Sequence, residues 1–282
     1  MPIWFAVIIL GLIEGITEFL PVSSTGHLLI AEHWLPRQSD LFNVVIQCGA
    51  VLAVLPLFPE RLNQFFHRWR EKETQDYLLK IGVAFVITCI GGFIWDKLGH
   101  KLPKDLTPVA WAVFIGGIAF IAVEGWLKNK PLTKNVTWNV ALAVGVGQLL
   151  AAIFPGTSRS GASIIFCLLC GLARPEATEF SFLVGIPTMM AAGGWEILKT
   201  LRHHSGEAHE NWGMLAVGFV VAAVVSFIAV KWLLGYVRNH TFVVFGWYRI
   251  GLAVLIAAML LATGKPDVAL VAPAAPAQTL KN

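Results

Sequence analysis

Two short polar segments interrupt the apolar stretches of this 282-residue chain and hold most of the side chains that could do chemistry. The first, residues 14–27, reads EGITEFLPVSSTGH and contains two glutamates, a run of three hydroxyl residues and a histidine. The second, residues 155–161, reads PGTSRSG and places an arginine between two serines. Carboxylates, a hydroxyl, an imidazole and a guanidinium are the groups that phosphoryl transfer requires.

The two glutamates of the first segment, Glu14 and Glu18, are four residues apart. On a helix this spacing puts both carboxylates on one face, where they can hold a divalent cation or share a proton. The alternative is an interfacial pair of solvated acids. Acids within a membrane are costly, so we expect a functional role.

The hydroxyl residues Ser23, Ser24 and Thr25 follow Pro21 at the start of a predicted helix. A helix start attracts anions, and a hydroxyl there can be a cap or a nucleophile. At least one of the three is expected to be a cap. His27 can be a general acid or base, or a structural hydrogen-bonding group.

Arg159 lies between Ser158 and Ser160, directly before an apolar helix. A guanidinium and free backbone N–H groups can bind phosphate oxygens together there, so we expect phosphate recognition. Two other charged residues lie in apolar surroundings. We expect Glu179 to support the site and Arg249 to pair with an acid, and a purely structural role is an equal alternative for each.

The composition defines the class of protein that must position these residues. The chain is 56% hydrophobic and 13% charged, whereas soluble domains are roughly a quarter charged. It is therefore an integral membrane protein. Lys and Arg (21) barely exceed Asp and Glu (17) and lie mainly in short polar intervals, which indicates membrane topology and excludes nucleic-acid binding.

The predicted fold is an all-α polytopic membrane protein with six transmembrane helices plus two re-entrant broken helical hairpins. The six spans are residues 42–58, 81–95, 108–127, 181–198, 212–234 and 242–263. Two further apolar stretches, 3–13 and 140–154, are too short to cross a bilayer. Each precedes one of the two polar segments, which predicts a hairpin that enters the membrane and returns.

The two hairpins coincide when the sequence is shifted against itself by 134 residues. The matched pairs include Gly11 with Gly145, Glu14 with Gln148, Pro21 with Pro155 and Ser24 with Ser158. Each half then holds three spans and one hairpin that returns to its own side. Because three is an odd number of crossings, the second half is inserted upside down relative to the first. We predict an inverted-topology repeat of residues 1–134 and 135–264, followed by a disordered tail, 265–282, with the hairpins meeting near the midplane.

The distribution of basic residues predicts the orientation. Five Lys and Arg residues lie within 59–80 and three within 128–134, so both intervals are expected in the cytoplasm and both termini outside.

Residues 14–27 and 155–161 closely resemble the two signature motifs of the bacterial undecaprenyl-diphosphate phosphatases, also called bacitracin-resistance proteins. The length, the span pattern and the segment EFSF at 179–182 are similar too. The resemblance implies an enzyme of the bacterial cytoplasmic (inner) membrane that removes the terminal phosphate of undecaprenyl diphosphate and recycles the carrier for peptidoglycan synthesis. It also implies dependence on Mg²⁺ or Ca²⁺ and an active site reached from the outer face.

The resemblance implies a role for each main polar residue. Glu14 and Glu18 correspond to the family's metal-binding or base pair and Ser24 to its nucleophile. His27 corresponds to its acid or base and Arg159 to its phosphate-binding arginine. Further substrate contacts are expected from Ser23, Thr25, Gly26, Ser158 and Ser160.

Several alternatives stay open. The nucleophile is Ser24, His27 or a metal-bound water. A lipid flippase or transporter is a second class, because inverted repeats with broken helices are a transporter architecture. The acid-phosphatase-like lipid phosphatases share the Gly-His and Ser-Arg steps, but their later His-x-x-x-Asp is missing after Arg159. The expected partners are a polyprenyl diphosphate and the membrane, and a homodimer is an open alternative for the oligomeric state.

Overall fold

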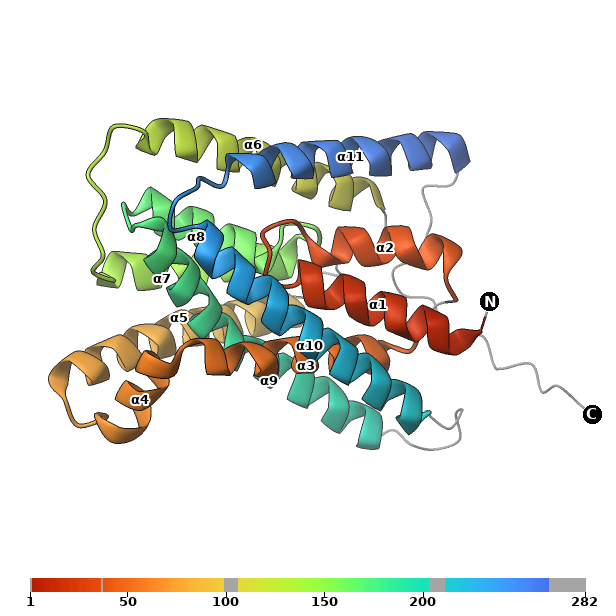
Figure 1. The fold of residues 1–282 in the computed structure, drawn as a ribbon, viewed down its shortest axis with the longest axis horizontal. Helices are drawn as coiled ribbons and strands as arrows, with labels where there is room; N and C mark the ends of the chain where they lie inside the picture. Colours follow the sequence, from red (N-terminus) through yellow and green to blue (C-terminus); the bar gives the residue numbers. More distant parts are fainter. Residues whose placement is uncertain (1, 37, 99–105, 203–210, 264–282) are drawn as a thin grey trace, which may run out of the picture.

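The computed structural model describes residues 2–36, 38–98, 106–202 and 211–263. All regular elements in this part of the chain are helices (Figure 1). They are, in chain order, α1 (Ile3–Thr17), α2 (Ser24–Trp34), α3 (Asp40–Val54), the 3₁₀ turn η1 (Leu55–Leu57), α4 (Pro59–His67), α5 (Lys72–Lys97), α6 (Leu106–Leu127), α7 (Trp138–Ile153), α8 (Arg159–Leu169), α9 (Arg174–Arg202), α10 (Trp212–Tyr236) and α11 (Val243–Thr263). The predicted tail, 265–282, lies outside the described residues.

Four helices in the described ranges are long and apolar enough to cross a bilayer. They are α5 over Lys72–Trp95, α6, α10, and α11 over Val243–Ala262. These helices correspond to the predicted spans 81–95, 108–127, 212–234 and 242–263. The prediction of a multi-pass helical membrane protein is therefore confirmed.

The first predicted span, 42–58, is not one straight helix. Helix α3 ends at Val54, η1 follows, and the chain turns by 83° into α4. Pro56 lies in the 3₁₀ turn and Pro59 begins α4. Proline cannot donate a backbone hydrogen bond and clashes with the preceding helical turn, which explains the break. The bent pair counts as a fifth span only when both parts are taken together.

The remaining predicted span, 181–198, lies within α9. This helix has 29 residues and is about 44 Å long at ~1.5 Å per residue. It contains Pro187 and begins with the charged residues Arg174 and Glu176. Its length is sufficient for a crossing, but it is not among the four apolar candidates.

The two short helical hairpins approach each other from opposite ends of the molecule. In Figure 1, α1 begins beside the N-terminus and α2 returns toward that end, whereas α7 begins at the other end and α8 returns to it. Helix α1 continues through Glu14 to Thr17, beyond the predicted apolar stretch. Glutamate is a good helix former, so Glu14 does not end the helix, and its side chain is buried inside the molecule.

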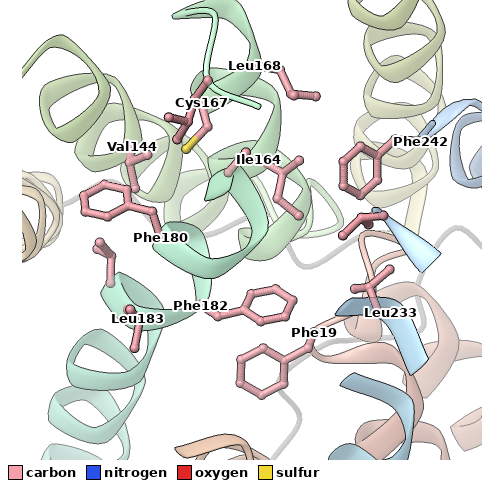
Figure 2. Close-up of a cluster of buried hydrophobic side chains, with 14 of the residues drawn as sticks. Phe19, Val144, Ile164, Cys167, Leu168, Phe180, Phe182, Leu183, Leu233 and Phe242 are labelled. Atoms are coloured by element: carbon pink, nitrogen blue, oxygen red, sulfur yellow. The ribbon is translucent and has the colours of Figure 1, made fainter. Parts of the chain in front are cut away.

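Each hairpin packs mainly against a long helix of the other half of the chain. Helix α1 contacts α10 and α7 contacts α5, while α6 and α11 lie side by side. Figure 2 shows the apolar cluster that joins these parts. Its labelled residues are Phe19, Val144, Ile164, Cys167, Leu168, Phe180, Phe182, Leu183, Leu233 and Phe242. The cluster connects the first hairpin turn with α7, α8, α9 and α10 and so holds this turn against the second hairpin.

Candidate active site

In each hairpin, one serine with an unusual backbone conformation directly precedes the second helix. In the described part of the chain, Ser23 (φ 76°) and Ser158 (φ 69°) are the non-glycine residues with positive φ. Each serine caps its helix, since Ser23 Oγ accepts from Gly26 N at 3.3 Å and Ser158 Oγ from Gly161 N at 3.2 Å. Such a backbone costs on the order of 1–3 kcal/mol per residue and is typical of functional sites.

The side chain of Glu18 connects the two hairpins. Ser24 Oγ donates a hydrogen bond to Glu18 Oε2 at 2.9 Å, and Arg159 Nη2 donates to Glu18 Oε1 at 3.1 Å. Ser160 Oγ adds contacts to the carbonyls of Leu20, at 3.3 Å, and Glu18, at 3.4 Å. Three predicted catalytic residues, Glu18, Ser24 and Arg159, therefore lie together, with Glu18 7% exposed.

Ser24 and Glu18 have the geometry of a nucleophile and its general base. Their 2.9 Å contact lies within the roughly 2.6–3.2 Å range expected for such a pair. Arg159 orients the base from the opposite side, as a third group does in known nucleophilic sites. The arrangement can therefore remove a proton from the Ser24 hydroxyl.

Arg159 has donors left for a ligand. Its side chain is 14% exposed, and its Nε and Nη1 are buried without a hydrogen-bond partner. The guanidinium lies over the ring of Phe19, with 5.6 Å from Cζ to the ring centroid. Phe19 packs edge-on against Phe182 at 4.8 Å (Figure 2). Unpaired buried N–H groups are costly, so an anion such as phosphate is the fitting partner.

Gly185 of α9 provides the space that Arg159 occupies. A Cβ built on Gly185 would lie 1.7 Å from Arg159 Nη1 and 2.7 Å from its Cζ. Any side chain at this position would therefore displace the guanidinium. No sequence motif points to Gly185, because a single glycine in an apolar helix carries no chemical signal.

Glu14 is fully buried, and neither of its carboxylate oxygens has a hydrogen-bond partner among the described residues. A buried, unpaired carboxylate needs a compensating group. The described residues contain no cluster of three or more His, Cys, Asp or Glu side chains. A cation that takes one or two carboxylates from the protein and its other ligands from phosphate and water, as Mg²⁺ does, fits these residues.

Both ring nitrogens of His27 lie within hydrogen-bond distance of groups other than the Ser24 hydroxyl. Nδ1 lies 2.7 Å from the Ser23 carbonyl oxygen, and Nε2 lies 2.7 Å from the hydroxyl of Tyr248. The predicted acid or base therefore lies in the same turn as Ser24, but its hydrogen bonds go to other groups. Tyr248 belongs to no recognised motif.

Arg249 joins the two hairpin turns to α6. It is fully buried and donates to five backbone carbonyls, those of Pro21, Ala112, Val113, Gly156 and Thr157. The prediction that Arg249 pairs with an acid is therefore wrong. The carbonyls that each turn leaves unpaired inside the helix bundle provide enough acceptors to satisfy a buried guanidinium without a carboxylate.

The other residues predicted to contact the substrate have different roles in the structure. The hydroxyls of Ser23 and Ser158 and the backbone N–H of Gly26 take part in helix capping. Ser160 bridges to the first turn, and Thr25 is half-buried in the first turn of α2. Capping is thus the role of Ser23, which leaves the neighbouring Ser24 hydroxyl for Glu18.

Glu179, expected to support the site, lies elsewhere. Its carboxylate pairs with Arg61 at 2.6 Å. Both residues line a cavity of about 390 Å³ whose other described lining residues are Leu57, Phe58, Pro59, Glu60, Gln64 and Arg238. No residue of either hairpin lines it. The apolar context of Glu179 in the sequence does not reveal that α4, after its bend, brings Arg61 to this carboxylate.

The fold and the site define an integral membrane protein in which two opposed helical hairpins bring together a hydroxyl, a carboxylate and an arginine. Residues 7–255 match the family described as bacitracin resistance protein BacA. The chain belongs to this family, and the prediction made from the two motifs is confirmed.

Several relatives share nearly the full length of the chain. An undecaprenyl-diphosphatase of Rhizobium etli (strain CFN 42) is 55% identical over 252 residues, which cover 89% of this chain and 95% of the relative. An undecaprenyl-diphosphatase of Xanthomonas axonopodis pv. citri is 49% identical and covers 88% and 95%. One of Xylella fastidiosa (strain 9a5c) is 48% identical and covers 89% and 97%.

Proposed function

We propose that this protein is a membrane phosphatase that hydrolyses undecaprenyl diphosphate to undecaprenyl phosphate and inorganic phosphate. The observation that carries the proposal is the contact of the Ser24 hydroxyl with Glu18, which Arg159 of the other hairpin also binds. The relatives named undecaprenyl-diphosphatase match this chain over almost its whole length. The reaction would recycle the lipid carrier for peptidoglycan synthesis and account for bacitracin resistance in the family name.

In the proposed reaction Ser24 is the nucleophile. Its Oγ attacks the terminal phosphorus while Glu18 accepts the hydroxyl proton. The new Oγ–P bond replaces the bond to the bridging oxygen, which leaves with undecaprenyl phosphate. Water then cleaves the phosphoserine and releases phosphate. Arg159 binds phosphate oxygens through its free Nε and Nη1 and lowers the charge repulsion in the transition state.

His27 is a less suitable nucleophile than Ser24. A nitrogen that attacks phosphorus needs a free lone pair, and the two ring nitrogens of His27 face the Ser23 carbonyl and the Tyr248 hydroxyl. His27 is therefore not the nucleophile in this proposal, and the acid or base role implied by the resemblance would need one of these two hydrogen bonds to be exchanged for one to the substrate.

Glu14 and Glu18 are the residues proposed to hold Mg²⁺ or Ca²⁺. Glu14 supports this assignment because its oxygens are buried and unpaired. A divalent cation bound there would neutralise phosphate charge. The protein's own contribution is to keep the Glu14 carboxylate buried beside the catalytic turn.

We also propose that the chain is an inverted repeat of residues 1–134 and 135–264 with six crossings. A Cβ on Gly11 would lie 3.2 Å from Val221 of α10, and a Cβ on Gly145 would lie 2.9 Å from Ile87 of α5. A shift of 134 residues takes Gly11 to Gly145 and Ile87 to Val221. The same close contact therefore occurs twice, each time between a hairpin helix of one half and a long helix of the other half.

The contacts at Gly11 and Gly145 follow the shift of 134 residues, but the hairpin turns do not. The serine with positive φ is Ser23 in one turn and Ser158 in the other, which corresponds to a shift of 135. The predicted match of Ser24 with Ser158 is thus replaced by one of Ser24 with Arg159. A one-residue difference in turn length lets the two turns present different chemical groups at equivalent positions.

The proposed location is the bacterial inner membrane, with the α1–α2 hairpin entering from the outer face. The α4–α5 and α6–α7 connections carry basic residues and lie at the end of the molecule opposite the N-terminus (Figure 1). Basic connections favour the cytoplasm. This orientation supports access of the lipid diphosphate from outside.

A lipid transporter is the second candidate, because the hairpins enter from opposite ends of the molecule (Figure 1), as they do in transporters built from inverted repeats. A transporter needs anion-binding groups but no hydroxyl aligned with a base. The Ser24–Glu18 contact therefore favours the phosphatase.

The test is phosphate release from undecaprenyl diphosphate by purified protein in detergent, with added Mg²⁺ or Ca²⁺. Ser24→Ala should abolish release. Thr188→Ala is the matched control, because the Thr188 hydroxyl bonds to the Val184 carbonyl of its own helix. No release by folded wild type with either cation would reject the phosphatase and favour the transporter. Wild-type release by Ser24→Ala would reject Ser24 as the nucleophile.

A further inference from the structure

Tyr248 of α11 contacts the catalytic turn through His27. Its hydroxyl lies 2.7 Å from His27 Nε2, and the two rings stack with centroids 5.6 Å apart and an interplanar angle of 9°. Tyr248 is itself 50% exposed at the surface of the helix bundle. The pair therefore connects the outer surface of α11 to the turn that presents Ser24.

The partners of His27 define its proton arrangement. The Ser23 carbonyl at Nδ1 can only accept a hydrogen bond, so Nδ1 carries the proton. In the neutral imidazole Nε2 then has a lone pair, which accepts from the Tyr248 hydroxyl. Tyr248 thus completes the hydrogen bonding of this tautomer.

The residue after Tyr248 acts on the same turn. Arg249 donates to the Pro21 carbonyl, two residues before Ser23. Two consecutive residues of α11 therefore hold the first hairpin turn. The Arg249 side chain binds the backbone of the turn, and the Tyr248 hydroxyl binds the His27 ring. Arg249 holds the shape of the turn, whereas Tyr248 acts only on the His27 side chain.

We propose that Tyr248 is a positioning residue of the active site, which keeps His27 in the Nδ1–H tautomer and in one orientation beside Ser24. This inference rests on the proposed phosphatase function. Tyr248 lies outside both polar segments, 14–27 and 155–161, and among the described residues it makes no hydrogen bond to Glu18, Ser24 or Arg159. It acts on turnover only through His27.

The kinetic test compares Tyr248→Phe with Trp247→Phe. The first keeps the ring and removes the hydroxyl, and the second alters a neighbouring side chain that is 61% exposed. Loss of one hydrogen bond that orients a catalytic group should lower kcat about tenfold. KM should stay within about twofold, because Tyr248 does not bind phosphate. Trp247→Phe should leave both constants unchanged.

A double-mutant cycle separates positioning from a general structural effect. If Tyr248 acts through His27, adding Tyr248→Phe to His27→Ala should cause no further loss of kcat. Losses that multiply in the double variant would overturn the proposal, as would a kcat of Tyr248→Phe equal to that of Trp247→Phe.

A second measurement does not need turnover. In ¹⁵N-histidine-labelled protein, the His27 resonances are identified by their absence in His27→Ala. Tyr248→Phe should shift the Nε2 resonance, and Trp247→Phe should not. An unchanged resonance would overturn the proposal even if the wild type releases no phosphate, a result that would by itself reject only the phosphatase function.

Discussion

Replacing Gly185 by alanine tests whether the position of Arg159 matters for catalysis. The added methyl group would lie 1.7 Å from Arg159 Nη1 and 2.7 Å from Cζ. Non-bonded heavy atoms approach to about 3.5 Å, so the guanidinium must move by roughly 2 Å. Such a movement takes Arg159 Nη2, now 3.1 Å from Glu18 Oε1, out of hydrogen-bond range.

The loss expected from Gly185→Ala follows from the bonds that Arg159 makes. A hydrogen bond to a charged group contributes about 1.5–3 kcal/mol. One such bond lost in the transition state lowers kcat/KM by roughly 10- to 150-fold. The free energy of unfolding should fall by at most about 2 kcal/mol, because the helix preference for alanine over glycine, up to about 1 kcal/mol, partly offsets the lost Arg159–Glu18 bond.

The assay is phosphate release from undecaprenyl diphosphate, with thermal unfolding of the same samples in detergent. Gly194→Ala is the matched control on α9, because a Cβ there would meet no atom within 4 Å. It should keep wild-type activity. If Gly185→Ala releases phosphate as fast as Gly194→Ala, the observed position of Arg159 is not the one that catalysis uses, and the argument from its geometry fails.

Two further substitutions test the rest of the site. Arg249→Met should lower the free energy of unfolding by several kcal/mol, because the Pro21, Gly156 and Thr157 carbonyls lose a donor and each unpaired group costs about 1–3 kcal/mol; an unchanged unfolding midpoint in detergent would contradict this role. Glu14→Gln should raise the Mg²⁺ or Ca²⁺ concentration for half-maximal phosphate release by about tenfold or more, and a superimposable metal titration would remove Glu14 from the cation site.

Much of the site could be predicted from local sequence. Glu18, Ser24 and His27 lie within ten residues, so a single turn between two short helices is enough to bring them near each other. The apolar composition predicts a membrane protein, and acids and an arginine within apolar stretches mark a site because burying them there is costly. These inferences need no knowledge of how the helices pack.

Other features depend on residues far apart in the chain. Arg159 reaches Glu18 across 141 positions, and Tyr248 reaches His27 across 221. An apolar helix shows little difference between its faces, so its sequence does not indicate which face meets a hairpin. The space at Gly185 and the partner of His27 therefore become defined only when α9 and α11 pack.

The division of roles among adjacent hydroxyl residues was also decided by the tertiary structure. Composition and spacing show that the first turn holds a cap and a candidate nucleophile, since serine serves both roles equally well. The backbone of Ser23 adopts positive φ and its hydroxyl caps α2, which directs the Ser24 hydroxyl to Glu18. The types and spacing of the residues establish which chemical groups are available, whereas packing of the two hairpins establishes which of them meet, because contacts between distant helices set the conformation of each turn.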